Sequence, residues 1–430
     1  MDRRALLRLL VATALSRPMF ALASASSSAP LSSADEAFLD DLERRGCLYF
    51  SEQVSPRTGQ VLDRAKWINN TGALDSHRMA SIAATGFGLT ALCIADKRAY
   101  QPSAQIVEQV RRTLRFHCDA FPHQHGFFCH FNDVETGKSW GNSEVSSIDT
   151  ALLLCGVLTA RAYFHHDAEI VRLATTIYER IDWSWMLNGE KTFSMGWRDG
   201  AFLKSRWNHY CELMMLYLLA IGSPTHPIDP VCWDAWSRPA MHYAGFDYIS
   251  AADPLFVHQY SHAWFDFRNK RDRYADYFAN SILATRAHQS FCLSLGTPYS
   301  TDYWGLSASD SQHGYTAWGG PPGFGGIDGS VVPYAAAGSL PFLPFDCLRV
   351  LHSLKDNFGK HAWGRYGFCD ALHPAAQWYD PDVQGIDLGI GVNMAENLRT
   401  GFVWETFAQN PEVSVALQRA GFHASLENSL

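Results

Sequence analysis

The alternation of two kinds of helical segment most constrains how this 430-residue chain can fold. Residues 103–119 and 168–181 are amphipathic with charged faces, whereas residues 82–95, 145–164 and 210–221 are apolar on almost every side. A helix that is apolar all round must be covered on all sides, and an amphipathic helix packs through one face. The alternation therefore predicts an all-α double ring of helices with few and short strands.

Three aromatic stretches each bring a carboxylate to the beginning of a buried helix. Residues 126–158 place Glu144 and Asp149 in this way, and residues 193–222 place Glu212. In residues 364–405, Asp387 precedes a long helix that also contains Glu396. The repetition predicts a ring of helices around an acidic, aromatic cleft.

The remaining segments complete a single domain over residues 34–422, followed by a tail over 423–430. Serine and aspartate are good N-caps, so Asp75 or Ser76 is expected to cap a helix that runs to Lys97, and Ser143 the helix with Glu144 and Asp149. Residues 193–207 are expected to form a hairpin, and the Gly/Pro-rich residues 314–329 a loop beside the cleft. Further helices are expected over residues 34–53, near 272–294 and near 341–357.

The N-terminus has the pattern of an export signal. Arg3 and Arg4 precede an apolar run, and small residues near 21–25 offer a cleavage site before a linker over 26–33. The pair of arginines also resembles a twin-arginine signal. We therefore expect a periplasmic or secreted protein, the alternative being a flexible amphipathic tail.

The charge and hydropathy of the chain disfavour several classes of partner. The formal charge is −8, and no basic patch is present, which disfavours nucleic acid and anionic membranes. The sequence has no run of about 20 apolar residues that would predict a membrane span, and no obligate protein partner is evident.

The chain has 14 Trp and 17 Tyr, which suit stacking on sugar rings as well as a core. The candidates for stacking are Trp140, Trp207, Trp304, Trp318 and Trp378.

The ten cysteines include no CxxC pair, and several lie in apolar helical segments. We interpret them as small buried hydrophobic residues, without a predicted disulfide.

Two carboxylates are the foremost catalytic candidates. Glu212 is surrounded by aromatic and apolar neighbours, which raise a carboxyl pKa and suit a proton donor; the alternative is an ion pair with Arg198, Lys204 or Arg206. Asp387 lies near a helix start, where backbone N–H groups stabilise the charged form of a base; the alternative is a plain N-cap.

Other charged residues have less distinctive patterns. Asp149 shares a face with apolar residues, so it and Glu144 suit substrate binding or structural pairing equally. Glu396 and Arg399, three residues apart, favour a mutual ion pair, with substrate binding as the alternative. Asp266 is expected either to contact substrate or to pair with Arg268.

Motifs of other chemistries are missing from the sequence. The histidines at 123, 125, 165 and 166 lack a companion HExxH or cysteine pair, which disfavours a catalytic metal. No GxSxG, P-loop or strand-linked GxGxxG occurs. Carboxylates with aromatics remain, and these are the groups that hydrolyse glycosidic bonds.

Three motifs in order resemble the bacterial glucoamylase-like domain, the family that includes endo-β-1,2-glucanases of glycoside hydrolase family 144. They are residues 366–371 (YGFCDA), 385–389 (GIDLG) and 396–401 (ENLRTG). The resemblance covers roughly residues 35–415. It implies an (α/α)6 toroid, an inverting mechanism without a metal or other cofactor, and β-1,2-glucan or sophoro-oligosaccharides as substrate.

By motif position, the resemblance also implies that Glu212 is the acid and Asp387 the base, each acting through a relay. A transglycosylase or an exo-acting, disaccharide-releasing enzyme on the same scaffold remains an alternative. A polysaccharide lyase would need a basic cleft, which the acidic balance disfavours. A periplasmic glycan-binding protein would need the aromatics but not the carboxylates.

Overall fold

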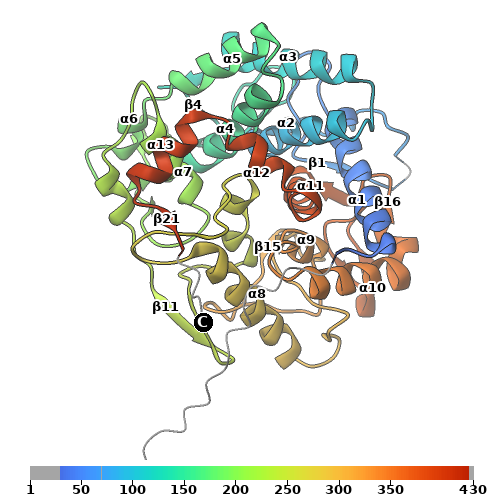
Figure 1. Ribbon diagram of the computed structural model, residues 1–430. Helices are drawn as coiled ribbons and strands as arrows, with labels where there is room; N and C mark the ends of the chain where they lie inside the picture. Colours follow the sequence, from blue (N-terminus) through green and yellow to red (C-terminus); the bar gives the residue numbers. More distant parts are fainter. Residues whose placement is uncertain (1–29, 69, 426–430) are drawn as a thin grey trace, which may run out of the picture.

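The computed structural model describes residues 30–68 and 70–425, so the predicted export signal lies outside the described residues. The chain forms the predicted double ring of helices (Figure 1). The α-helices are α1 (Ser33–Glu52), α2 (Ile82–Lys97), α3 (Ser103–Asp119), α4 (Ser147–Tyr163), α5 (Ala168–Glu179), α6 (Trp183–Leu187), α7 (Met214–Gly222), α8 (Tyr277–Ser294), α9 (Pro333–Ala337), α10 (Pro344–Ala362), α11 (Gly385–Thr400), α12 (Phe402–Phe407) and α13 (Pro411–Arg419). The 3-10 helices are η1 (Pro230–Asp234), η2 (Leu255–His258), η3 (Tyr260–Ala263) and η4 (Pro374–Ala376).

The strands are short, as predicted, and pair in twos and one group of three. They are β1 (Arg64–Lys66), β2 (Met79–Ser81), β3 (His123–Gln124), β4 (Phe127–Phe128), β5 (Phe131–Asp133), β6 (Val145–Ser146), β7 (Phe193–Ser194), β8 (Gly196–Arg198), β9 (Ala201–Phe202), β10 (Arg206–Trp207), β11 (Ala240–Tyr243), β12 (Phe246–Ile249), β13 (Lys270–Arg271), β14 (Ala308–Ser309), β15 (Thr316–Ala317), β16 (Trp363–Gly364), β17 (Gly367–Phe368), β18 (Leu372–His373), β19 (Trp378–Tyr379), β20 (Asp382–Gln384) and β21 (His423–Ala424). The predicted hairpin over 193–207 is present as β7 paired with β10, with β8 and β9 between them. β21, in the predicted tail, pairs with β13.

The inner helices are the ones that the sequence makes apolar all round. Nearly every residue of α2, α4, α7 and α11 is buried, whereas α3, α5 and α13 bury one face. α2 packs against α4, α11 and α1, while α3 packs on α5 outside them. Among the described residues, no helix has both the length and the apolar character needed to cross a membrane.

Helices α2 and α4 approach each other through glycine. A Cβ on Gly156 would lie 2.0 Å from the carbonyl oxygen of Gly86, and one on Gly86 would lie 2.3 Å from that of Leu152. No side chain fits at either position, which explains the small residues in this part of the sequence.

The start of α2 corrects the prediction of a cap at Asp75 or Ser76. The helix begins at Ile82, and the Ser81 hydroxyl accepts a hydrogen bond from the N–H of Ala84. Residues 79–81 are instead drawn out as β2, because they pair with β5.

The start of α4 corrects the prediction of a cap at Ser143. Ser146 caps this helix, and Glu144 lies before it, because β6 pairs with β8. Asp149 therefore lies in the first turn, where its N–H donates to Ser146 Oγ and the Ser146 hydroxyl donates to Asp149 Oδ2.

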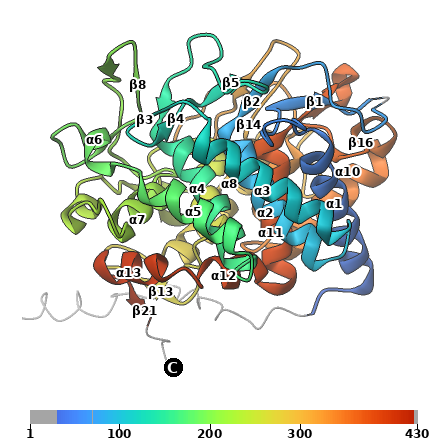
Figure 2. The ribbon, with the colours of Figure 1, turned by 90° about the horizontal axis from the view of Figure 1, so that it is seen from above.

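The two sides of the ring differ in structure. Figure 2 shows β1, β2, β5, β8 and β14 gathered along one side, and α12, α13, β13 and β21 along the other. Because β2, β6 and β20 lead directly into α2, α4 and α11, the first turns of these inner helices face the side with the strands. All ten cysteines are described and free, and eight of them are buried, as expected for small hydrophobic residues.

Candidate active site

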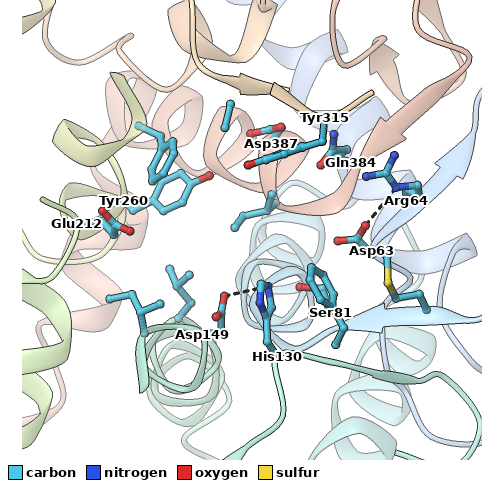
Figure 3. Close-up of a pocket in the computed structure, with 17 residues that line it drawn as sticks. Asp63, Arg64, Ser81, His130, Asp149, Glu212, Tyr260, Tyr315, Gln384 and Asp387 are labelled. Atoms are coloured by element: carbon cyan, nitrogen blue, oxygen red, sulfur yellow. Dashed lines mark hydrogen bonds and ion pairs between the residues drawn. The ribbon is translucent and has the colours of Figure 1, made fainter. Parts of the chain in front are cut away.

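A cavity of about 480 Å³ lies where the inner helices meet the loops with the strands. Its residues come from many segments, because each inner helix or its preceding loop contributes one or two side chains (Figure 3). The polar and tyrosine side chains that line it are Asp63, Arg64, Ser81, His130, Asp149, Glu212, Tyr260, Tyr315, Gln384 and Asp387.

Asp387 lies in the first turn of α11 and is 6% exposed. β20 pairs with β1, and the chain turns from β20 directly into the helix, with Gln384 as the N-cap residue. The helix N-terminus favours a negative charge at this position. The structure thus places Asp387 at the cavity, where the sequence predicted an acid at a helix mouth.

Asp387 shares a hydrogen bond with a second carboxyl group, that of Asp370. Asp370 is fully buried, and its Oδ2 accepts hydrogen bonds from Gln384 Nε2 at 2.9 Å and from the N–H of Asp310 at 3.0 Å. Burial and the neighbouring charge of Asp387 raise the pKa of Asp370 well above its ordinary value. Burial raises the pKa of Asp387 to about 7, although the hydrogen bond with Asp370 lowers it. The pair therefore holds one proton near neutral pH, and Asp370 is the group that keeps it.

Glu212 approaches the cavity from another side, just before α7 (Figure 3). Burial, with a smaller contribution from the charge of Asp149, raises the pKa of Glu212 to about 7. Arg198 and Arg206, which were alternatives as ion-pair partners, bind backbone carbonyl groups of Asn142 and of Leu187 and Thr192 instead. Glu212 thus retains a proton near neutral pH, as a general acid requires.

His130 lies between Glu144 and Asp149. Its Nε2 is 3.4 Å from Asp149 Oδ1, and its Nδ1 is 3.7 Å from Glu144 Oε1. Burial opposes a charge on His130, but the two carboxylates outweigh it and raise the pKa of the imidazole. Asp149 and His130 line the cavity, whereas Glu144 lies outside the lining and contacts the Nδ1 side of the His130 ring.

Two tyrosines, with Phe131 and Phe256, supply the aromatic surface of the cavity. Tyr260 in η3 is almost buried beside Glu212, whereas Tyr315 is 64% exposed and lies beside Asp387 (Figure 3). Tyr315 belongs to the predicted Gly/Pro-rich loop, which β14 and β15 shape into a hairpin over the cleft. An exposed aromatic ring beside a carboxylate suits stacking on a sugar ring.

The five tryptophans expected to stack on sugars do not line this cavity. Trp304 and Trp318 are buried in the core, and Trp318 Nε1 donates to Ser309 Oγ. Trp207 is also buried and donates to Ser147 Oγ. Trp140 is exposed on a loop, and Trp378 lines a separate hollow with Trp67. Burial corrects the predicted stacking role of Trp207, Trp304 and Trp318, because packing decides which rings are exposed, whereas stacking by Trp140 and Trp378 stays a prediction.

Glu396, Arg399 and Asp266 lie away from the cavity. Glu396 binds Lys97 and Arg98, each at 2.8 Å, while Arg399 binds Glu43 at 2.5 Å and Glu36 at 3.0 Å. The predicted pair between Glu396 and Arg399 is therefore wrong, because α1 and α2 supply stronger partners. Asp266 pairs with Arg268 at 2.9 Å in a hollow near β21, so it is structural.

Sequence reasoning missed several residues that the fold brings to the cavity. Asp370 stands within the YGFCDA motif, so the motif offered a signal for it. His130, Arg64, Tyr260 and Tyr315 carry no local pattern, and only the packing of distant segments reveals them.

Two groups of side chains have the spacing of a metal site: His130 with Glu144 and Asp149, and Asp310 with Asp380 and Asp382. In the first group, the imidazole already lies between the two carboxylates and neutralises them. The second group adjoins the cavity behind Asp370.

Comparison with known proteins finds a similar family. The glycoamylase model, described as "Putative glucoamylase", matches residues 204–411. Over these residues the chain is thus similar to the glucoamylase-like family. A curated relative from Parabacteroides distasonis, an exo β-1,2-glucooligosaccharide sophorohydrolase acting at the non-reducing end, is 27% identical over 90% of this chain. The chain spans 58% of the length of that relative.

Solved structures confirm the fold of this glucoamylase-like chain. An endo-β-1,2-glucanase from Chitinophaga pinensis, in complex with sophorotriose and glucose, superposes with a TM-score of 0.84 at 27% identity, over 92% of this chain and 99% of that one. An endo-β-1,2-glucanase from Talaromyces funiculosus, at 11% identity, has a TM-score of 0.66 over 90% of each chain, which shows the shared fold. The architecture is the (α/α)6 toroid that the sequence predicted.

Proposed function

We propose that this protein is an inverting glycoside hydrolase that acts on β-1,2-glucan or sophoro-oligosaccharides, with Glu212 as the acid and Asp387 as the base. The names of its relatives support the substrate class, since the Parabacteroides distasonis protein is a sophorohydrolase and the Chitinophaga pinensis enzyme holds sophorotriose and glucose. The N-terminal arginines and apolar run support export to the periplasm or beyond.

One observation supports the assignment of roles most strongly: the cavity contains two buried acids that have different partners. Glu212 has apolar and aromatic neighbours and a carboxylate, Asp149, nearby, so it keeps its proton. Asp387 lies at a helix N-terminus and hydrogen-bonds to Asp370, and both contacts favour its charged form, although burial raises its pKa to about 7. Two buried carboxyl groups with different partners in one cavity are the equipment of an acid and a base.

The reaction follows from these states. Asp387 takes a proton from water, directly or through a relay, and the oxygen of that water attacks the anomeric carbon. The glycosidic C–O bond breaks, and Glu212 gives its proton to the leaving oxygen, either directly or through a substrate hydroxyl. The anomeric configuration inverts because a single displacement occurs. Tyr315 stacks on a sugar ring beside Asp387.

The test is incubation with a panel of linkage-defined glucans, with products resolved by size and by anomer. We expect release of short β-1,2-linked oligosaccharides, initially in the α-anomeric form. Inactivity on every β-1,2-glucan would refute the substrate class, and a β-anomer as the first product would refute inversion.

The same panel separates the alternatives. Sophorose as the sole early product identifies exo action, as in the Parabacteroides distasonis relative, whereas a ladder of sizes identifies endo action. Products longer than the substrate identify a transglycosylase. A glycan-binding protein would retain its full function in Asp387→Asn and Glu212→Gln, so loss of turnover with retained binding excludes it.

A further inference from the structure

A group of three aspartates, Asp310, Asp380 and Asp382, lies behind the cleft. Neighbouring hydrogen-bond donors and cations do not pair with all of its carboxylate oxygens. Asp310 follows β14, Asp380 follows β19, and Asp382 begins β20. One carboxylate oxygen from each of the three lies within 4.8 Å of the others. The group therefore joins two segments that are distant in sequence, one with Asp310 and one with Asp380 and Asp382.

Two oxygens of this group are buried and lack any hydrogen-bond donor. They are Asp380 Oδ2, on a side chain that is 2% exposed, and Asp382 Oδ1. The other oxygen of Asp380 accepts a hydrogen bond from the N–H of Asp382 at 2.9 Å. A buried carboxylate oxygen without a donor or a cation is costly, so an electropositive partner is needed there.

Neighbouring cations are engaged elsewhere. Arg64 binds Asp310 and Asp63, and His77 Nδ1 lies 2.7 Å from Asp75 Oδ1. Of the three carboxylates in the group, Asp310 thus has a positive partner, whereas no lysine or arginine of the described residues is paired with Asp380 or Asp382.

We propose that Asp310, Asp380 and Asp382 bind a calcium ion that fixes one wall of the cleft. Ca²⁺ takes six to eight oxygen ligands, and its opposite ligands lie about 4.6–5.2 Å apart, so three oxygens at this spacing reach one ion. An all-oxygen carboxylate set suits a hard cation rather than zinc or copper. Asp382 is half-buried and Asp310 partly exposed, which leaves a route for the ion and room for water ligands.

The ion has a structural consequence for the cleft. Asp310 anchors the hairpin that carries Tyr315, and Asp382 lies in the strand that leads into α11 and Asp387. One ion therefore ties the aromatic loop to the segment that carries the candidate base, and its role does not depend on the proposed substrate.

The test uses thermal unfolding of the full chain with EDTA and with Ca²⁺. With three protein carboxylates and water, we expect weak affinity, with a Kd of about 10⁻⁴–10⁻³ M. About 10 mM Ca²⁺ should then raise the Tm of the wild-type protein by roughly 2–5 °C. In EDTA, Asp382→Asn should be at least as stable as the wild type, because it removes repulsion, but it should gain nothing from Ca²⁺. No rise in the wild type, or an equal rise in Asp382→Asn, would overturn the proposal.

Terbium luminescence provides a second measurement. Trp67 Nε1 donates to the carbonyl oxygen of Asp380 at 2.7 Å, so this indole lies close enough to sensitise Tb³⁺ bound at the group. We expect a signal that Ca²⁺ displaces, that Asp382→Asn abolishes, and that Glu144→Gln leaves in place. Trp67→Phe should remove the luminescence while keeping the Ca²⁺-dependent Tm rise. A signal lost in Glu144→Gln and kept in Asp382→Asn would assign the ion to the His130 group and refute the proposal.

Discussion

Helix α11 carries one buried carboxylate near each end, each paired with a carboxylate from another segment, and the two pairs differ in their cations. At the cleft end, Asp387 hydrogen-bonds to Asp370, without an arginine or lysine paired to either in the described structure. At the other end, Glu396 and Glu43 are both fully buried and are surrounded by Lys97, Arg98 and Arg399. The same helix thus places acids in two environments of opposite electrostatic character.

The difference separates chemistry from structure. Three cations hold the carboxylates of the distal pair in ion pairs. Burial raises the pKa of Glu396, but Lys97, Thr400 and Arg98 outweigh it and lower that pKa, whereas burial and the charge of Glu396 raise the pKa of Glu43. The cleft pair keeps a proton near neutral pH because no such cations stabilise two charges. A carboxylate that remains able to exchange a proton is what a general base requires.

The largest effect is expected from Asp387→Asn. The amide cannot accept a proton from water, so we expect turnover on sophoro-oligosaccharides to fall by about 10²–10⁴-fold while sugar binding remains. A reducing-sugar assay measures turnover, and calorimetry with a sophoro-oligosaccharide measures binding. Near wild-type turnover in this variant would remove Asp387 from the role of base.

The matched change at the other end is Glu396→Gln. It leaves Lys97 and Arg98 without their buried partner, so we expect a loss of about 3–5 kcal/mol in the free energy of unfolding, with kcat nearly unchanged. Urea unfolding followed by tryptophan fluorescence measures the loss. A drop in kcat comparable to that of Asp387→Asn, with stability unchanged, would reverse the contrast between the two ends.

The sequence predicted the helices better than their first residues. Ser103–Asp119 was predicted with its observed bounds, because its apolar positions recur at helical spacing and a proline precedes it. The starts of α2 and α4 were misplaced, because β2 and β6 pair with strands distant in sequence. A cap is a local signal, and pairing with a remote strand overrides it.

Only part of the candidate site was predicted, because the rest also depends on contacts between segments that are distant in sequence. Asp387, Glu212 and Asp149 were found because an acid at the start of an apolar helix is unusual, and the structure brings all three to one cavity. Three of the five predicted stacking tryptophans are buried, since composition does not tell whether a ring such as Trp304 is core or surface. Tyr315 and Asp370 depend on how distant loops meet.

Asp370→Asn is expected to have an intermediate effect. Protonated Asp370 already donates to Asp387 near neutral pH, and the amide N–H of asparagine is a weaker donor, so it stabilises the charged form of Asp387 less. We expect the acidic limb of the pH–kcat/KM profile to move up by about one unit and the rate near pH 7 to fall by up to about tenfold, because less of Asp387 is ionised. A merely structural role would lower the rate at all pH values without moving the limb.

The smallest effect concerns Glu212 and pH. Its folded-state pKa, raised to about 7, lies above the ordinary value, so folding favours the protonated form. Stability from this group is full below the unfolded pKa and is lost as pH rises through about 7. Glutamine never ionises, so the variant does not lose this stability as pH rises. We therefore expect the free energy of unfolding of Glu212→Gln, relative to that of the wild type, to be about 1–3 kcal/mol higher at alkaline pH than at acidic pH. Urea unfolding at both pH values measures the difference.

The wild-type rate should fall over the same alkaline range, because the acid loses its proton. If the midpoint of the fall in rate coincides with the midpoint of the fall in stability, both belong to the Glu212 carboxyl. A stability difference that does not change with pH would show that Glu212 is charged throughout and is not the proton donor.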